Sequence, residues 1–175
     1  MTLNDATNFI KEPYMTVTIQ PDIQMQELRS VPQGALIQYG TRYGFRVPDG
    51  NDSAGRCGMA LYSPDCDLFE IVFGSIRESA LSFAACAVVL DIDLSAPAMR
   101  ISTVAPPKAS LYMAHGRPMF VVTYTDDEDF CLLDVTNGDI MAPDYNPTWS
   151  FPKWRICIED KSGKMTPLIE RVTAE

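Results

Sequence analysis

The sequence contains a single histidine, His115, and this scarcity limits the chemistry that the chain can perform. Structural and catalytic zinc sites draw on several cysteine, histidine or acidic ligands, so a zinc site built from several histidines is excluded. His115 stands before Gly116 in a pair that is typical of tight turns, and no sequence motif supplies a nucleophile for it. We therefore interpret His115 first as a turn residue and expect neither a metal nor a cofactor.

Long apolar runs are also missing. The longest, FAACAVVL at residues 83–90, is shorter than the roughly 18 uncharged residues that span a bilayer. The first 20 residues lack the basic start and apolar core of a signal peptide. These two absences favour a soluble, cytoplasmic protein without membrane contact.

Basic residues are few relative to acidic ones. The chain has 14 Lys and Arg against 23 Asp and Glu, which gives a formal charge of -9 at pH 7. Such a field repels phosphate backbones and anionic lipid surfaces and attracts basic proteins. We therefore expect no nucleic-acid binding and a protein partner with a basic surface, while the composition leaves the oligomeric state open.

The size and the cysteine content indicate one reduced globular domain. A chain of 175 residues with 46% hydrophobic residues fits a single domain over residues 1–175, and we expect residues 1–13 and the last few to be loose. Five cysteines cannot all pair, and three of them, Cys86, Cys131 and Cys157, stand in apolar strand-like runs. This pattern predicts thiols in a reducing compartment rather than disulfides.

Four consecutive acids interrupt the stretch MFVVTYTDDEDFCLLDVTNGDI at residues 119–140. Pairing Thr125 with Phe130 would align the apolar side chains of both flanking runs on one face of a hairpin. The acids would then form its four-residue loop: Asp126, Asp127, Glu128 and Asp129. Further turns at His115-Gly116 and Asn137-Gly138 extend the hairpin to a four-stranded antiparallel meander over residues 110–141.

A second four-stranded meander is predicted over residues 35–73. A loop at residues 40–42 would bring two apolar sets together on one face. The sets are Ala35, Ile37 and Tyr39 on one strand and Val47, Phe45 and Tyr43 on the other.

Between the meanders, residues 75–88 have the pattern of a helix that turns into a strand near residues 88–94. Ser75 and Glu78 have the spacing of a capping box, and apolar residues recur at helical intervals after them. An alternative interpretation makes this segment two more strands in a small propeller-like arrangement of blade-like meanders. We also expect one strand within the proline-rich residues 96–110 and a closing hairpin that turns at Ser162-Gly163. The predicted fold is mainly β, with antiparallel meanders forming a sandwich or distorted barrel and one short helix.

Two segments could carry chemistry. Cys57 follows Arg56 near the end of a glycine-containing loop, and a neighbouring cation can lower the pKa of a thiol. An enzyme or small-ligand-binding protein could therefore use Cys57 or His115, with residues 48–55 as a lid. In that loop Asp49, Asn51 and Ser53 offer oxygen atoms at alternate positions, but Ala60 stands where a bidentate acid would be needed, so we interpret the loop as a turn.

The leading hypothesis is a non-catalytic protein-binding module of inhibitor or immunity type, or a component of an assembly. Acids gather at the predicted hairpin turns, at residues 126–129 and at Asp139 and Asp144, where they could steer a basic partner. Trp149 and Trp154, in the segment PDYNPTWSFPKW, have the composition of an aromatic interface anchor or of a flap that covers the core. The predicted partner-binding residues are thus the four acids of residues 126–129 together with Trp149 and Trp154.

Overall fold

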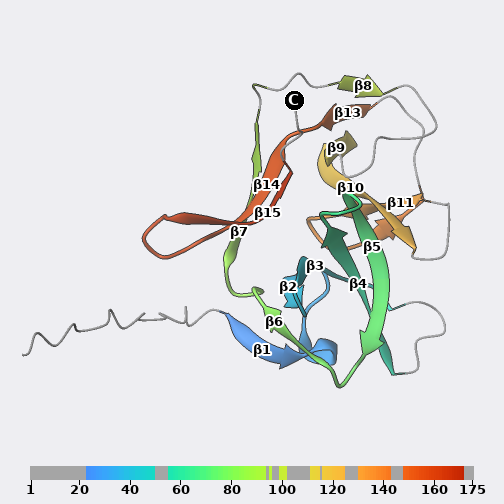
Figure 1. Cartoon of the computed structure of the whole chain (residues 1–175), viewed down its shortest axis with the longest axis vertical. Coiled ribbons are helices and arrows are strands. Elements are labelled where there is room, and N and C mark those ends of the chain that lie inside the picture. The colour runs from blue at the N-terminus through green and yellow to red at the C-terminus, as the bar shows by residue number, and fades with distance from the viewer. Residues whose placement is uncertain are drawn as a thin grey trace, which may run out of the picture.

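The structure is a computed structural model that describes residues 23–49, 55–93, 95, 99–101, 111–114, 116–124, 130–142 and 148–171, with the backbone alone for residues 99–101 and 148. The described residues form two sheets, a 12-stranded sheet A and a three-stranded sheet B (Figure 1). In chain order the strands are β1 (Gln24–Glu27), β2 (Leu36–Tyr39), β3 (Arg42–Val47), β4 (Arg56–Ser63), β5 (Leu68–Ser75), β6 (Ser79–Ser82), β7 (Ala87–Ile92), β8 (Met99–Ile101), β9 (Leu111–Ala114), β10 (Arg117–Tyr124), β11 (Phe130–Asp134), β12 (Ile140–Met141), β13 (Thr148–Phe151), β14 (Trp154–Glu159) and β15 (Met165–Arg171).

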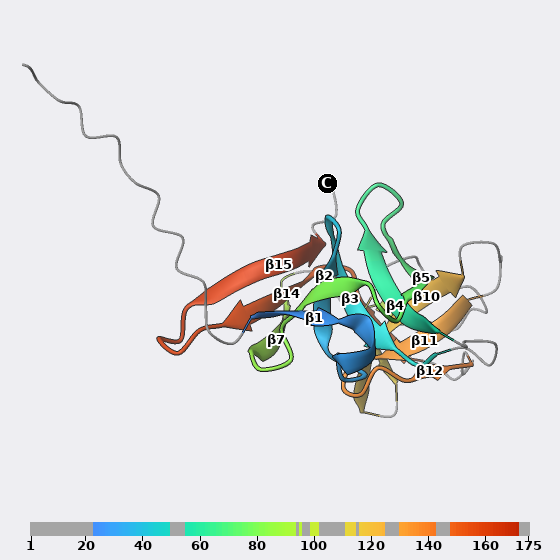
Figure 2. The ribbon, with the colours of Figure 1, turned by 90° about the horizontal axis from the view of Figure 1, so that it is seen from below.

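Both predicted meanders are present in sheet A. Strands β2 to β5 pair consecutively and antiparallel, and so do β9 to β12. The two meanders join where β10 pairs in parallel with β5. Sheet B, in the order β15-β14-β7, lies beside sheet A, and its β14–β15 hairpin projects from the body of the molecule (Figure 2). The mainly β, sandwich-like prediction is confirmed.

The register of the β10–β11 hairpin differs from the prediction by two residues. Phe130 pairs with Thr123 rather than with Thr125, and Phe120 pairs with Leu133. A shift of two residues preserves the face on which each side chain lies, because side chains alternate along a strand. Phe120, Val122 and Leu133 therefore share one buried face, as the pattern predicted.

The predicted register of the β2–β3 hairpin is wrong by one residue, and this error changes which side chains share a face. Tyr39 pairs with Arg42 across a two-residue turn, so Gly40 and Thr41 form the turn and Arg42 begins β3. A one-residue shift moves the two apolar sets to opposite faces. Phe45 and Val47 face sheet B, whereas Ile37 packs on the other side of sheet A with Leu28 of the 3-10 turn η1 (Leu28–Ser30). Both faces of this meander are buried, so alternation alone could not identify the shared face.

The predicted helix at residues 75–88 is absent, and its residues form β6 and β7 instead. Ser75 and Glu78 form one of the two capping-box contacts: the amide of Ser75 donates to the Glu78 carboxylate at 3.0 Å. The Ser75 hydroxyl accepts instead from the amide of Arg77 at 3.3 Å, and the amide of Glu78 donates to the Ser75 carbonyl at 3.0 Å. These bonds close a turn after β5. Among the described residues η1 is the helical element, and no helix there has the length and apolar character to cross a bilayer.

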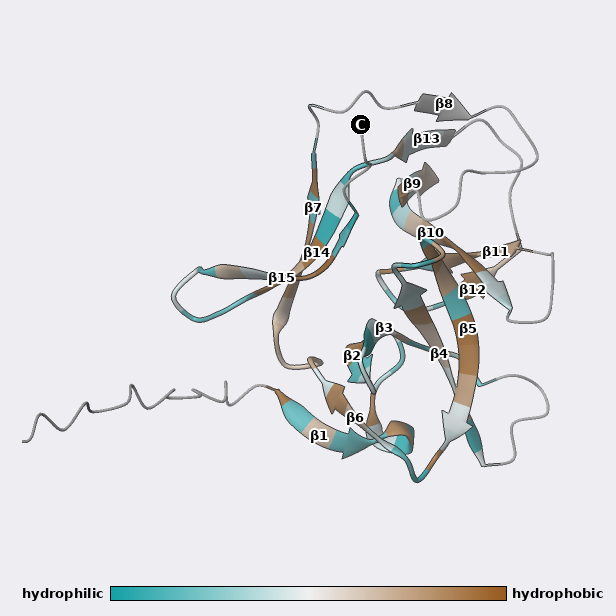
Figure 3. Ribbon diagram, viewed as in Figure 1, coloured by the Kyte–Doolittle hydropathy of each residue, from teal (hydrophilic) through white to brown (hydrophobic). Residues whose placement is uncertain are grey.

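The core lies between the sheets and is rich in aromatic side chains. Trp154 of β14 has its ring centroid 4.5 Å from that of Phe120 and 6.1 Å from that of Phe69. Tyr62 of β4 packs against Trp154 at 5.8 Å. Burial of one such side chain contributes about 3 kcal/mol. Figure 3 shows the corresponding hydrophobic colouring along β5 and β10.

The meanders are also fastened by a close approach of two turns. Gly34, before β2, and Gly138, after β11, both have positive φ, 79° and 77°. A Cβ atom on Gly138 would lie 2.5 Å from the nitrogen of Gly34 and 2.7 Å from the carbonyl oxygen of Arg46. Glycine is thus required at position 138 for its φ and for the space.

We predict that Gly138→Ala lowers the free energy of unfolding by about 3 kcal/mol, because the clash with backbone atoms adds to the cost of positive φ. Gly40→Ala is the matched control, since Gly40 has a φ of 60° and nothing within 4 Å of the added Cβ. It should cost only about 1 kcal/mol. Chemical denaturation of both variants measures the difference, and equal losses would show that the two turns do not touch.

Candidate binding surface

The structure locates some of the predicted partner-binding residues and not others. Asp126, Asp127, Glu128 and Asp129 lie outside the described residues, as does Asp144, so the acidic loop remains a prediction. The strands on either side of it, β10 and β11, are both described.

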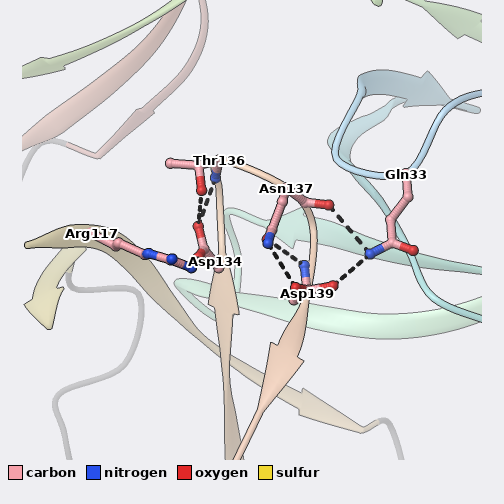
Figure 4. Close-up of polar contacts among 6 residues, drawn as sticks. All are labelled: Gln33, Arg117, Asp134, Thr136, Asn137 and Asp139. Carbon is pink, nitrogen blue, oxygen red and sulfur yellow. Dashed lines mark hydrogen bonds and ion pairs between the residues drawn. The ribbon is translucent and has the colours of Figure 1, made fainter. Parts of the chain in front are cut away.

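Asp139, another acid of the hypothesis, is occupied within the chain (Figure 4). One carboxylate oxygen accepts a hydrogen bond from the Gln33 amide at 2.8 Å, and the other accepts from Asn137 at 2.7 Å. Gln33 also donates to the Asn137 carbonyl. Asp139 therefore braces the two meanders at the Gly138 turn, which is a structural role that needs no partner.

Asp134, at the end of β11, is the centre of a second polar cluster in Figure 4. Its side chain is 0% exposed, and it accepts bonds from the Thr136 amide at 2.9 Å and from Arg117 at 3.0 Å. The Thr136 hydroxyl donates to the same carboxylate. Burial opposes the charge of Asp134, but these donors outweigh it and hold its pKa below the ordinary value.

The two tryptophans have different environments. Trp154 is 1% exposed within the core, so its side chain offers no surface to a partner, and the prediction that it anchors an interface is not supported by its position. Trp149, on β13, is 52% exposed. Its neighbour Ser150 is buried, as expected where side chains alternate along a strand.

Cys57, the candidate nucleophile, lies in the core on β4 and is 1% exposed. Burial raises the pKa of its thiol more than nearby Arg46 lowers it. A buried thiol with a raised pKa is a poor nucleophile. His115 lies outside the described residues. All five cysteines are thiols, as the sequence predicted.

The interpretation of the loop at residues 48–55 as a turn stays a prediction, because residues 50–54 lie outside the described residues. Asp49, at the start of this loop, has partners within the chain. Its carboxylate accepts a hydrogen bond from Arg46 at 2.7 Å and one from the Gly58 amide at 3.2 Å. Arg46 is itself buried and donates to the Gly58 carbonyl at 3.0 Å. This cluster fastens the ends of β3 and β4. Asn51 and Ser53 lie outside the described residues, and those that are described contain no group of three or more His, Cys, Asp or Glu that could hold a metal.

A charged cleft lies on sheet B, where sequence analysis had placed no site. Its volume is about 450 Å³, and it is lined by Asp91, Ile92, Asp93, Lys153, Trp154, Arg155, Glu170 and Arg171. The central charged row crosses all three strands, because Arg155 pairs with Asp91 of β7 and with Glu170 of β15. Arg155 forms an ion pair with Asp91, which raises the pKa of Arg155. The alternation of Lys153 with Arg155, and of Asp91 with Asp93, indicates a charged face on each segment but does not indicate that the two segments pair.

One wall of the cleft is tied to sheet A. The guanidinium of Arg171 donates to both carboxylate oxygens of Asp67, at 2.9 and 2.8 Å, and to the carbonyl of Pro152 at 2.8 Å. Asp67 ends the β4–β5 turn with a φ of 49°, a conformation that aspartate tolerates better than most residues. Its carboxylate also accepts a bond from Tyr62, and burial together with Asp67 raises the pKa of Tyr62 to about 12. The cleft is therefore held in place from both sheets.

We predict that Asp134 makes the stability of the protein depend on pH in the acid range. Because its folded pKa is lowered, its contribution is present above about pH 4, the unfolded value, and is lost as the pH falls through the folded pKa. Asp134→Asn should remove that part of the dependence and lower stability at pH 7. Urea unfolding from pH 2 to pH 7 measures it, and identical pH profiles for the two proteins would refute the assignment.

For the thiols, we expect labelling at pH 7 to follow exposure. Cys66 is exposed and should react first, whereas Cys57 and Cys157 are buried and have raised pKa values, so they should react only after unfolding. Peptide mapping by mass spectrometry after timed alkylation identifies each site. Rapid modification of native Cys57 below pH 7 would restore the catalytic interpretation.

Comparison of the chain with protein-family models, with curated proteins and with solved structures finds no match.

Proposed function

We propose that the chain is a non-catalytic protein-binding module of inhibitor or immunity type, or an assembly component, that acts in the cytoplasm on a partner with a basic surface. The observation that carries the proposal is the exposure of Trp149 on β13, 52% of which faces solvent. Tryptophan is enriched among the residues that dominate protein interfaces, because it buries a large area with little loss of side-chain entropy.

The charge of the chain supports the same proposal. A net charge of -9 accelerates encounter with a basic protein and slows encounter with an acidic one. Aromatic side chains would then supply affinity at short range, while the acids, including residues 126–129, would supply rate and selectivity.

The proposal is tested by placing a photo-crosslinking amino acid at position 149 in the native host. Thr41 serves as the control position, because it is exposed in the β2–β3 turn, far from β13 in Figure 1. We expect one basic protein to be crosslinked from position 149 and not from position 41. Equal products from both positions would contradict the proposal.

With that protein purified, we expect Trp149→Ala to weaken binding by about tenfold or more. Replacement of Asp126, Asp127, Glu128 and Asp129 by serine should leave folding nearly intact and slow association, most strongly at low salt. Stopped-flow kinetics separates the two effects. An unchanged association rate would remove the acidic loop from the recognition surface.

A further inference from the structure

The strand β7 forms one edge of sheet B and differs from the other edge strands. Natural edge strands are protected by shortness, proline, bulges, inward charges or charged side chains, lysine above all, on the edge. The one charge of β7, Asp91, is paired with Arg155 of β14. Among the strands that end a sheet in the described part of the chain, β1, β8 and β12 have four, three and two residues, and β15 contains Pro167 and a register shift. β7 has six residues, AVVLDI, with neither proline nor lysine. Figure 3 shows it as predominantly hydrophobic.

The pairing with β14 determines which backbone groups of β7 point outward. The amide of Asp93 donates to the carbonyl of Lys153, which continues the register in which Ile92 pairs with Trp154. In an antiparallel ladder, hydrogen-bonded and non-hydrogen-bonded pairs alternate. Val88, Leu90 and Ile92 therefore direct their amides and carbonyls away from β14, and β14 is the only strand that pairs with β7 among the described residues.

The two faces of β7 differ in chemistry. The side chains of Val88, Leu90 and Ile92 lie on the inner face, since they pair with the core residues of β14. Val88 is nevertheless 42% exposed, so the apolar face of the sheet extends past the part that sheet A covers. The outer face carries Asp91 and, just beyond the strand, Asp93.

Both acids have capacity for another donor. Asp91 uses one carboxylate oxygen for Arg155, and Asp93 accepts hydrogen bonds from the amide and the side chain of Ser95. The other oxygen of Asp91 accepts no hydrogen bond from the described residues, and Asp93 is exposed to solvent. Both residues line the charged cleft, which thus begins at the β7 edge and offers room for a long side chain.

We propose that β7 is a strand-addition site for an extended segment of another protein in which apolar and basic residues alternate. The amides and carbonyls of Val88, Leu90 and Ile92 pair with the backbone of the segment, and its apolar side chains continue the inner face. Its Lys or Arg side chains reach Asp91 and Asp93. This inference rests on the proposed protein-binding function and adds the chemistry of the partner.

A second copy of the chain is a weaker occupant than a basic segment. Two copies would each bring a net charge of -9 to the contact, and pairing β7 with itself brings no basic residue to Asp91 or Asp93. A basic segment would pair with the outward backbone groups of β7 and would also bring positive charge to Asp91 and Asp93. Charge complementarity therefore favours a basic segment over a second copy.

Amide hydrogen exchange of the full chain is the first test. In the unbound protein we expect the amides of Val88, Leu90 and Ile92 to exchange much faster than those of Val89 and Asp91, which point toward β14. Protection of all five amides in the monomer would mean that another part of the chain covers the edge. Protection that grows with protein concentration would mean that a second copy does. Either result overturns the proposal.

The second test uses a short blocked peptide of alternating lysine and valine as the probe. We expect it to protect Val88, Leu90 and Ile92, and we expect an alternating glutamate–valine peptide to bind at least about tenfold more weakly. Val88→Pro removes one outward amide while the bonds to β14 remain, so it should weaken binding by about tenfold. Val88→Thr, which retains the amide, is the control.

Circular dichroism and thermal unfolding verify that both Val88 variants are folded. Should Val88→Pro lose its fold, Asp91→Asn combined with Asp93→Asn replaces it and must reduce binding of the lysine peptide. Unchanged binding by these variants, or binding without protection of β7, overturns the proposal. Crosslinking at Trp149 is independent of β7, so a partner found there together with an inert β7 would refute this inference and leave the protein-binding function standing.

Discussion

The contact of Trp154 with the aromatic side chains of sheet A is the interaction on which the two-sheet arrangement depends. Trp154 is the first residue of β14, and its ring packs on Phe69 and Phe120, which come from two adjacent strands of the larger sheet. Those strands, β5 and β10, belong to different meanders. One side chain of sheet B therefore packs across the junction of both units, and the Arg171–Asp67 ion pair fixes the same end of the sandwich.

The polar clusters follow the same logic, because each joins segments that are distant in the sequence. Gln33 and Asp139 hold the turns of the two meanders together, and Arg46 with Asp49 closes the ends of β3 and β4. Several acids that looked like a recognition surface thus have internal partners. What the described surface offers beyond them is one exposed tryptophan, a charged cleft and one unprotected strand edge.

Sequence reasoning succeeded where the signal was local. The turns at Gly116, Asn137-Gly138 and Ser162-Gly163 were predicted from residue types that favour positive φ, and these three glycines have φ values of 75°, 77° and 81°. It failed where two patterns competed. Residues 75–88 combine a capping-box spacing with small and β-branched residues, and tertiary pairing with β1, β2 and β14 decided for strands.

The site was harder to predict than the fold because it depends on contacts between distant strands. The charged cleft joins β7 to β14 and β15, and no pattern in one sequence reveals that residues near position 91 pair with residues near position 155. Burial of Trp154 and exposure of Trp149 were equally undetermined, since either tryptophan could have faced the core. Only the fold distinguishes them.

The separation between β7 and β14 has a consequence for biosynthesis. As the ribosome releases the chain from its N-terminus, β7 emerges while β14, β15 and the core residues Phe120 and Trp154 are still to be made. Pairings between such distant segments form slowly, because closing the long loop between them costs conformational entropy before any stabilising contact is made. The nascent polypeptide therefore exposes the apolar side chains of β7 before β14, the strand that pairs with it, has been made.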